Sequence, residues 1–244
     1  MEADADAPTF PPLLRGQPAP PGRTAFQAAV AAARAGTDAG LIVHDMRPEH
    51  LSAAVVLAPE CPLEQAMGMV LVAANGFGDA FGARAPAEVA IHFEWPGAFR
   101  VNGARCGGLR AAADTRDPAA LPGWLVIGLE MPFLTVSAGR EPGETPDHTA
   151  LWEEGCGDIT PPDLLEAWAR HFLTWVHEWE TGGMRRVHQA WTGRAHGLTE
   201  AVELTLAGGS FSGRFSGLDE GGGMLLKGEA GTQVLPLSLM LEEV

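Results

Sequence analysis

Apolar residues recur along this chain with two spacings, one typical of helices and one typical of strands. From residue 63 to residue 81 they recur every three or four positions, which predicts a helix that lies on a sheet. Thr160 combines a capping hydroxyl with prolines in the first turn and an acid three residues on, so a long helix is predicted to start there. A helix starting at Thr24 and a shorter one carrying Val187 and Trp191 complete the predicted helices.

Short apolar segments between these helices predict the strands of a sheet. Residues 41–43 and 51–58 are two such segments, and residues 89–95 alternate between apolar and polar side chains. Asn102-Gly103 is the pair that most readily takes the left-handed backbone angles of a two-residue turn, so the segments on either side are predicted to form a hairpin. A further strand is predicted over 125–129.

The C-terminal part of the chain has a different character. Four short apolar segments there are separated by glycine pairs or triplets, which is typical of a small barrel. They cover 201–206, 210–218, 224–227 and 233–237. A loop rich in glycine, proline and glutamate is predicted over 137–148. We therefore expect three parts, namely a proline-rich segment over 1–22, a core domain over 23–193 and a barrel over 194–244.

Composition and charge narrow the class of protein. The chain has 244 residues, of which 46% are hydrophobic, so it can bury a sizeable core. Polar residues and glycines interrupt the stretch from 63 to 81, and the first 22 residues hold no apolar run, so neither a membrane span nor a signal peptide is predicted. A net charge of −15 disfavours binding to the phosphates of nucleic acids.

Cysteine and histidine usage argues against disulfides and metal sites. Cys61, Cys106 and Cys156 are odd in number and isolated, which indicates neither a disulfide framework nor a zinc knuckle and favours a reducing cytoplasm. His171 and His177 lie six positions apart, a spacing that does not bring two imidazoles to one helix face. There is also no P-loop, no dinucleotide-binding glycine motif and no G-x-S-x-G elbow.

Five segments of the chain, in the right order, resemble the biotin and lipoate protein ligase superfamily. The turn at 94–97 looks like the tryptophan-proline turn of biotin ligases, and the hairpin at 101–109 resembles the one that ends in lysine-x-x-glycine. The other three likenesses are the core strand at 125–129, the threonine-containing segment at 149–155 and the C-terminal strands at 210–236. The resemblance implies an α+β fold, with a mixed sheet like that of biotin ligases and class II aminoacyl-tRNA synthetases, followed by a small SH3-like β-barrel.

Residues that the family needs for ATP-dependent ligation are replaced here. The family holds the phosphate of its acyl-adenylate in a glycine- and arginine-rich loop between its first two strands, whereas the connection at 44–50 is short, acidic and free of glycine. Arg105 stands in place of the hairpin lysine, and the only lysine of the chain is Lys227. Gly97-Ala98 replaces an asparagine-aspartate pair, and Glu130-Met131-Pro132 replaces the glycine-rich end of the core strand. These changes argue against the use of ATP.

The resemblance suggests five candidate ligand-binding residues, which are Arg105, Trp95, Gly107, Gly108 and Thr24. The guanidinium of Arg105 offers two parallel N–H donors that match the oxygens of a carboxylate or phosphate. The alternative is a surface arginine after a turn. Trp95 is either the wall of a ligand pocket or part of the core.

Cys156 is the candidate nucleophile. It precedes a glycine and lies just before the helix predicted at Thr160, which resembles the placement of the nucleophile in cysteine-dependent octanoyltransferases. A nearby helix N-terminus is expected to lower the pKa of the thiol and favour the thiolate. The alternative is an inert cysteine in a loop, while Cys106 is predicted to pack in the core. As a nucleophile, Cys156 is expected to line one cavity with Arg105 and Trp95.

Three hypotheses about function follow. The chain is a degenerate acyl-adenylate ligase, a cysteine-dependent octanoyl or lipoyl transferase that uses Cys156, or a non-catalytic binder of acyl ligands. The small ligands implied by the resemblance are biotin, lipoate and octanoate, and no metal is expected. The partners it implies are the acyl ligand, a biotinyl or lipoyl carrier domain and a second copy of the chain in a homodimer, with neither nucleic acid nor membrane among them.

Overall fold

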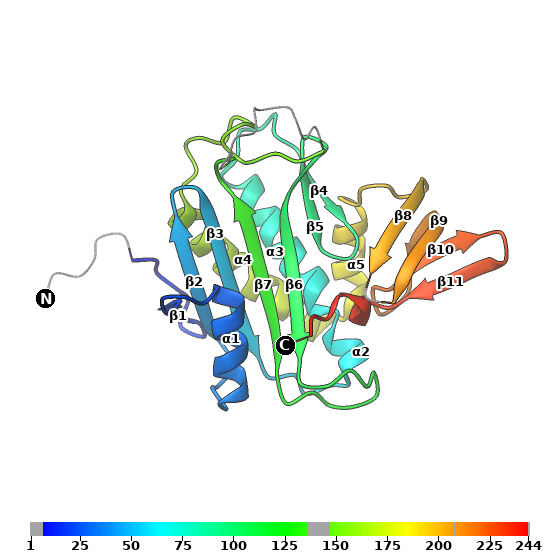
Figure 1. The fold of residues 1–244 in the computed structure, drawn as a ribbon, viewed down its shortest axis with the longest axis horizontal. Helices are drawn as coiled ribbons and strands as arrows, with labels where there is room; N and C mark the ends of the chain where they lie inside the picture. The colour runs from blue at the N-terminus through cyan, green and yellow to red at the C-terminus, as the bar shows by residue number, and fades with distance from the viewer. Residues whose placement is uncertain (1–6, 136–146, 207, 244) are drawn as a thin grey trace, which may run out of the picture.

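A seven-stranded mixed sheet forms the framework of the computed structural model, which describes residues 7–135, 147–206 and 208–243. The strand order is β1-β2-β3-β7-β6-β5-β4 (Figure 1). β1 pairs with β2 in parallel, and each other neighbouring pair is antiparallel. The strands are β1 (Arg15–Pro18), β2 (Leu41–Arg47), β3 (His50–Leu57), β4 (Ile91–Glu94), β5 (Ala98–Val101), β6 (Ala104–Ala113) and β7 (Leu125–Pro132).

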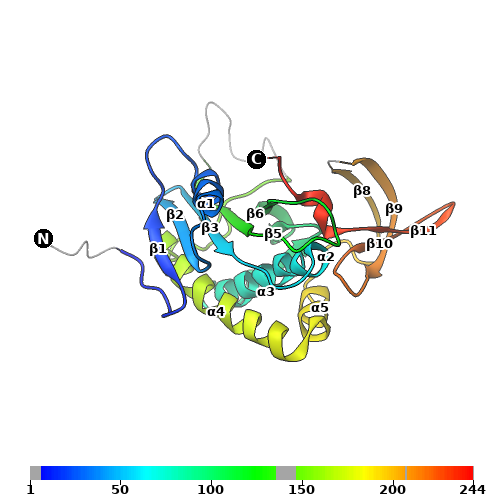
Figure 2. The ribbon, with the colours of Figure 1, turned by 90° about the horizontal axis from the view of Figure 1, so that it is seen from below.

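Helices cover both faces of this sheet. The helix α1 lies over one face, while α3 and α4 lie over the other, as the two views in Figures 1 and 2 show. The helices are α1 (Ala25–Arg34), α2 (Leu63–Ala66), α3 (Met69–Gly82), α4 (Pro161–Gly182) and α5 (Met184–Thr192). Within the described ranges, none of them is both long enough and apolar enough to span a bilayer.

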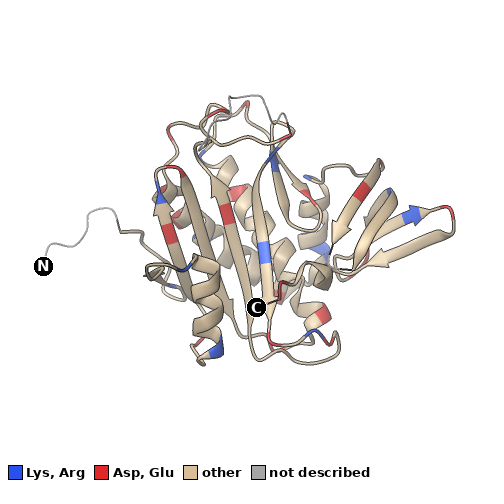
Figure 3. Cartoon of the chain, viewed as in Figure 1, with Lys and Arg blue, Asp and Glu red and all other residues tan. Residues whose placement is uncertain are grey.

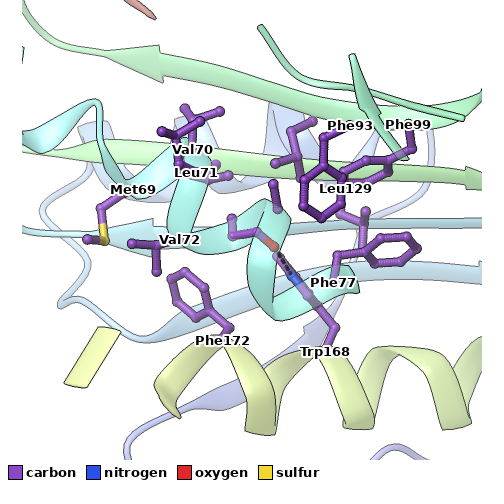
Figure 4. Close-up of a cluster of buried hydrophobic side chains, with 14 of the residues drawn as sticks. Met69, Val70, Leu71, Val72, Phe77, Phe93, Phe99, Leu129, Trp168 and Phe172 are labelled. Carbon is purple, nitrogen blue, oxygen red and sulfur yellow. Dashed lines mark hydrogen bonds between the residues drawn. The ribbon is translucent and has the colours of Figure 1, made fainter. Parts of the chain in front are cut away.

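The larger core lies between the sheet and the α3–α4 layer (Figure 4). Aromatic rings fill it, and the rings of Phe77 and Phe99 stack with their centroids 4.5 Å apart. The indole N–H of Trp168 on α4 donates to the carbonyl oxygen of Ala73 on α3 at 3.2 Å, so this buried polar group is satisfied. The close packing of α3 on α4 makes this side of the sheet a rigid support.

The helix α1 starts where the sequence predicts. The hydroxyl of Thr24 accepts from the backbone N–H of Gln27, and the side chain of Gln27 accepts in return from the backbone N–H of Thr24, which completes a capping box. Phe26 packs against the sheet over Gly128, where a Cβ atom would come within 2.6 Å of the ring. The helix therefore sits close to the sheet and presents its N-terminus over β3 and β7.

The helix predicted from residue 63 to residue 81 is two helices in the structure. The helix α2 ends at Ala66, and α3 starts at Met69 after a break at Met67 and Gly68. A Cβ atom on Gly68 would lie 2.9 Å from the sulfur of Met184, so the break is packed tightly against α5. Hydrophobic spacing continues through the break because both helices face the same core, which explains why the pattern alone predicts one helix.

The C-terminal part forms a separate, four-stranded antiparallel sheet in the order β11-β10-β9-β8. Its elements are β8 (Ala201–Leu206), β9 (Gly209–Leu218), β10 (Met224–Gly228), β11 (Gly231–Leu235) and the 3₁₀ helix η1 (Leu237–Met240). The four predicted strands are confirmed. After η1 the chain returns to the main sheet, where the backbone N–H of Glu242 donates to the carbonyl oxygen of Ala111 on β6 at 2.9 Å.

The remaining local comparisons concern the β5–β6 hairpin, the strand β1 and the loop predicted over 137–148. The hairpin of β5 and β6 is confirmed, because Asn102 and Gly103 have φ angles of 49° and 94°. The strand β1 was not predicted, because its four residues lie among prolines and are all exposed. The loop predicted over 137–148 lies, apart from its last two residues, outside the described ranges. The α+β fold class with a small C-terminal β unit is therefore confirmed.

Candidate functional site

A cavity of about 660 Å³ opens on the α1 side of the main sheet, at the N-terminus of α1. Its lining residues come from α1, β2, β3, β7 and the adjoining loops, and most of them are of polar types. The lining residues are Gly22, Arg23, Thr24, Gln27, Asp45, Arg47, Glu49, His50, Ser52, Glu130, Pro132 and Leu134. Thr24, one of the predicted ligand-binding residues, is therefore at the wall of this cavity.

The floor of the cavity is a row of residues that run side by side across four strands. Asp45 on β2 is in register with Ser52 on β3, Ser52 with Glu130 on β7, and Glu130 with Gly108 on β6. Ala54, two positions along β3 from Ser52, packs beneath α1, so the row lies on the α1 face of the sheet. Strand pairing thus fixes the spacing of these groups.

Glu130 is at the centre of a hydrogen-bond network on this floor. Its carboxylate lies 2.7 Å from Nε2 of His50 and accepts a hydrogen bond of 2.9 Å from the hydroxyl of Ser52. Nη1 of Arg110 lies 3.7 Å from the same carboxylate. Three side chains from β3 and β6 therefore hold a negative charge in the middle of the cavity.

The connection between β2 and β3 is a tight turn. Arg47 pairs with His50 across the hairpin, which leaves Pro48 and Glu49 as the two turn residues. The guanidinium of Arg47 forms an ion pair of 2.8 Å with Asp45 on its own strand. This turn occupies the position where the family resemblance implies a phosphate-binding loop, and it adds the carboxylate of Glu49 to the wall.

A smaller cavity of about 290 Å³ adjoins the first one at Glu130. Gly107 and Gly108, both predicted ligand-binding residues, line it together with Met240 and Glu242 of the C-terminal segment. We call the two cavities together the cleft. Positively and negatively charged residues both occur along the strands of the main sheet (Figure 3).

Arg105 pairs with a carboxylate of its own chain. Its guanidinium donates to both oxygens of Glu94, and Nε of Arg100 donates to the same carboxylate at 2.5 Å. Burial alone would raise the pKa of Glu94, but the hydrogen bonds from both arginines hold that pKa below its ordinary value. The donors that were predicted to receive a ligand are therefore engaged by Glu94.

Trp95 is buried between the two sheets. Its side chain is 2% exposed, and its indole N–H donates to the carbonyl oxygen of Gly222 in the C-terminal part at 3.0 Å. It therefore joins the main sheet to the C-terminal sheet. Of the two interpretations of Trp95, these contacts support a place in the core.

Cys156 lines a third cavity of about 550 Å³, beside the exposed ring of Trp152. The residue itself is 2% exposed, and burial raises the pKa of its thiol, with a further contribution from Glu154 and Glu88. The lowered pKa expected from the N-terminus of α4 is wrong, because desolvation and two carboxylates disfavour the thiolate. Cys106 is a core residue as predicted, and burial raises its pKa to about 12.

Arg105, Trp95 and Cys156 therefore have different surroundings. Arg105 contacts Glu94, Trp95 contacts Gly222, and of the three only Cys156 lines one of the cavities described above. No cluster of three or more metal-binding side chains occurs in the described part of the chain.

The central residues of the cleft were largely missed by sequence reasoning. Glu130 was noticed as a departure from the family pattern, but His50 and Ser52 were not singled out. Strand alternation puts all three on one face once the pairing of β3 with β7 is known. The contact between Arg110 and Glu242 joins residues 132 positions apart, and no local sequence signal indicates it.

The raised pKa of Cys156 predicts slow acylation. Incubation of the native protein with an octanoyl thioester near neutral pH is expected to leave Cys156 unmodified by intact mass, because the thiol stays buried and protonated. The rate of alkylation by iodoacetamide should rise as the pH is raised toward the elevated pKa, and unfolding in urea should raise it further. A native adduct that hydroxylamine removes and that is lost in Cys156→Ser would show that Cys156 is a nucleophile.

Comparison with known proteins identifies the family of this chain. The model of the biotin/lipoate A/B protein ligase family matches residues 10–193. The chain is 28% identical over 182 residues to the biotin–[acetyl-CoA-carboxylase] ligase of Paracoccus denitrificans, which covers 75% of each protein. The fold is of the biotin ligase type, and this chain belongs to the biotin/lipoate A/B protein ligase family.

Two solved structures extend the similarity over nearly the whole chain. A biotin protein ligase-like protein of unknown function from a Silicibacter species is 50% identical, with a TM-score of 0.90, and the match covers 97% of this chain and 100% of that one. The biotin protein ligase of Aquifex aeolicus in complex with biotin and ATP is 17% identical, with a TM-score of 0.67, over 91% of this chain and 94% of that one. The second likeness concerns the fold alone.

Proposed function

We propose that this protein binds a small acyl ligand of the biotin, lipoate or octanoate type in the cleft and does not carry out ATP-dependent ligation. The observation that carries the proposal is the carboxylate of Glu130, which His50 and Ser52 hold on the floor of the cleft. A ligase that forms an acyl-adenylate must stabilise phosphate charge, and a fixed carboxylate in the same cavity opposes that.

The charges around the larger cavity support this view. Three acids, Asp45, Glu49 and Glu130, line it together with two arginines, and one of these, Arg47, is already paired with Asp45. The other, Arg23, is exposed in the loop before α1, where an ion pair is weakened by water. A triphosphate would therefore meet more fixed negative charge than free positive charge in this cavity.

The missing lysine supports the same conclusion. The family resemblance implies a lysine in the β5–β6 hairpin, where this chain has Arg105 held by Glu94. Lys227, the only lysine of the chain, is on β10 in the C-terminal sheet. No other ammonium group is available in the main sheet to replace it.

Binding itself is supported by the cavities and by the relatives. The larger cavity alone has the volume of a small-molecule site, and several residues with polar side chains line it. The Aquifex aeolicus ligase of the same fold was solved with biotin and ATP. We infer that this chain keeps the acyl-binding part of that function and uses it for recognition.

Calorimetry on the full chain tests the proposal. The ligands are biotin, lipoate and octanoate, each as the free acid and as the amide. We expect at least one of them to give a saturable binding isotherm without ATP. ATP alone is expected to give none. Leu134→Trp should weaken binding by roughly tenfold, because it fills the cleft wall, whereas Leu121→Trp, at another exposed leucine, should not. Absence of heat with each of these ligands would refute the proposed binding function.

A further inference from the structure

Three arginines on β2 and β6 of the main sheet are already paired with carboxylates of the same chain. One ion pair lies within β2, one joins β6 to β4, and one joins β6 to the C-terminal segment. They are Arg47 with Asp45, Arg105 with Glu94, and Arg110 with Glu242. An anion that bound one of these three guanidinium groups would have to displace its carboxylate. Arg23, the other arginine that lines the larger cavity, is exposed in the loop before α1, where its attraction for an anion is weakened by water. The charge of the ligand's own carboxyl group is therefore expected to affect binding.

Arg110 is the arginine of this set that lines the smaller cavity, close to Glu130. Its Nε and Nη2 donate to the two oxygens of Glu242, both at 2.6 Å, in the fork geometry that a guanidinium uses for any carboxylate. The guanidinium also lies 4.6 Å from the centre of the Phe26 ring, beneath α1. Arg110 is thus fixed from both sides, with its two best donors in use.

The backbone holds Glu242 in place as well. Its N–H donates to the carbonyl oxygen of Ala111 on β6 at 2.9 Å, and Nη2 of Arg116 donates to the carbonyl oxygen of Leu241 at 3.0 Å. Glu242 lines the smaller cavity directly. The C-terminal segment therefore supplies a resident carboxylate at the inner end of the cleft, in a place where a ligand acid would otherwise meet Arg110.

We propose that the cleft selects acyl ligands whose carboxyl group is already converted to an amide, in preference to free acids and acyl phosphates. This inference rests on the proposed binding function and names the chemical class of its ligand. An amide carries no charge, so it requires no free guanidinium. Its N–H groups can donate to the carboxylate of Glu130, which both cavities share.

Calorimetry with matched acid and amide pairs tests this selectivity. The pairs are biotin with biotinamide, lipoate with lipoamide, and octanoate with octanamide. We expect the full-length protein to bind the amide of at least one pair roughly tenfold more tightly than the acid. In Glu242→Gln the guanidinium of Arg110 loses its resident carboxylate, so the affinity for the acid should rise and the preference should shrink or reverse.

Glu243→Gln is the matched control, because it removes the same charge from the neighbouring exposed residue and should leave the preference unchanged. Thermal midpoints of both variants verify that they are folded. Equal or tighter binding of the free acid by the unmodified protein would refute the amide preference and leave the proposed binding function standing. The same shift in both variants would refute the role of Glu242, and no binding of any ligand would refute the proposed function itself.

Discussion

Replacing Gly107 with alanine is expected to destabilise the protein by roughly 2–4 kcal/mol, since it combines backbone strain with a backbone clash. Gly107 has a φ of +72°, a region that residues with a Cβ atom rarely adopt. A Cβ atom there would lie 2.1 Å from the carbonyl oxygen of Glu130, well inside van der Waals contact. The neighbouring strand would have to move, and with it the carboxylate on the floor of the cleft.

Gly103→Ala is the matched control for this prediction. Gly103 also has a positive φ, of +94°, but no atom lies within 4 Å of the position of its Cβ. It should therefore cost only the backbone strain, about 1–2 kcal/mol. Urea unfolding of the two variants measures the difference. Equal free energies of unfolding would mean that Gly107 does not approach β7 as closely as described.

Most of the fold could be predicted from local patterns in the sequence. Caps and turns have strong local signals, so the starts of α1 at Thr24 and α4 at Thr160 and the turn at Asn102-Gly103 are confirmed. The strand β1 and the break before α3 escaped prediction. The strand β1 forms because it pairs with β2, and the break before α3 is packed against Met184 of α5. Both features therefore depend on residues that are distant in sequence.

The site was harder to predict than the fold. Thr24, Gly107 and Gly108 were chosen by resemblance and do line the cleft. The proposed loss of ligation rests on ion pairs and hydrogen bonds across the fold, such as Glu130 with His50 and Arg110 with Glu242. Such pairs span many residues, and only strand register and the return of the C-terminal segment bring their members together.

The proposed loss of ATP-dependent ligation has the largest expected effect, because it predicts no turnover under conditions in which an active ligase forms an acyl-adenylate. Acyl-adenylate formation requires phosphate-binding groups, and the two-residue turn at Pro48 and Glu49 supplies none of the glycines or arginines that the family resemblance implies there. The carboxylate of Glu130 adds repulsion on the cleft floor. Both features act on the chemical step and not on acyl binding.

Pyrophosphate release is the measurement that tests this account most directly. The purified protein is incubated with ATP and magnesium together with biotin, lipoate or octanoate, and the biotin protein ligase of Aquifex aeolicus serves as the active control under the same conditions. We predict no release above the background without protein for each of the three acids. Acyl-dependent release of pyrophosphate, even of one equivalent per protein, would contradict the account, because it would show that the cleft accepts a triphosphate despite Glu130.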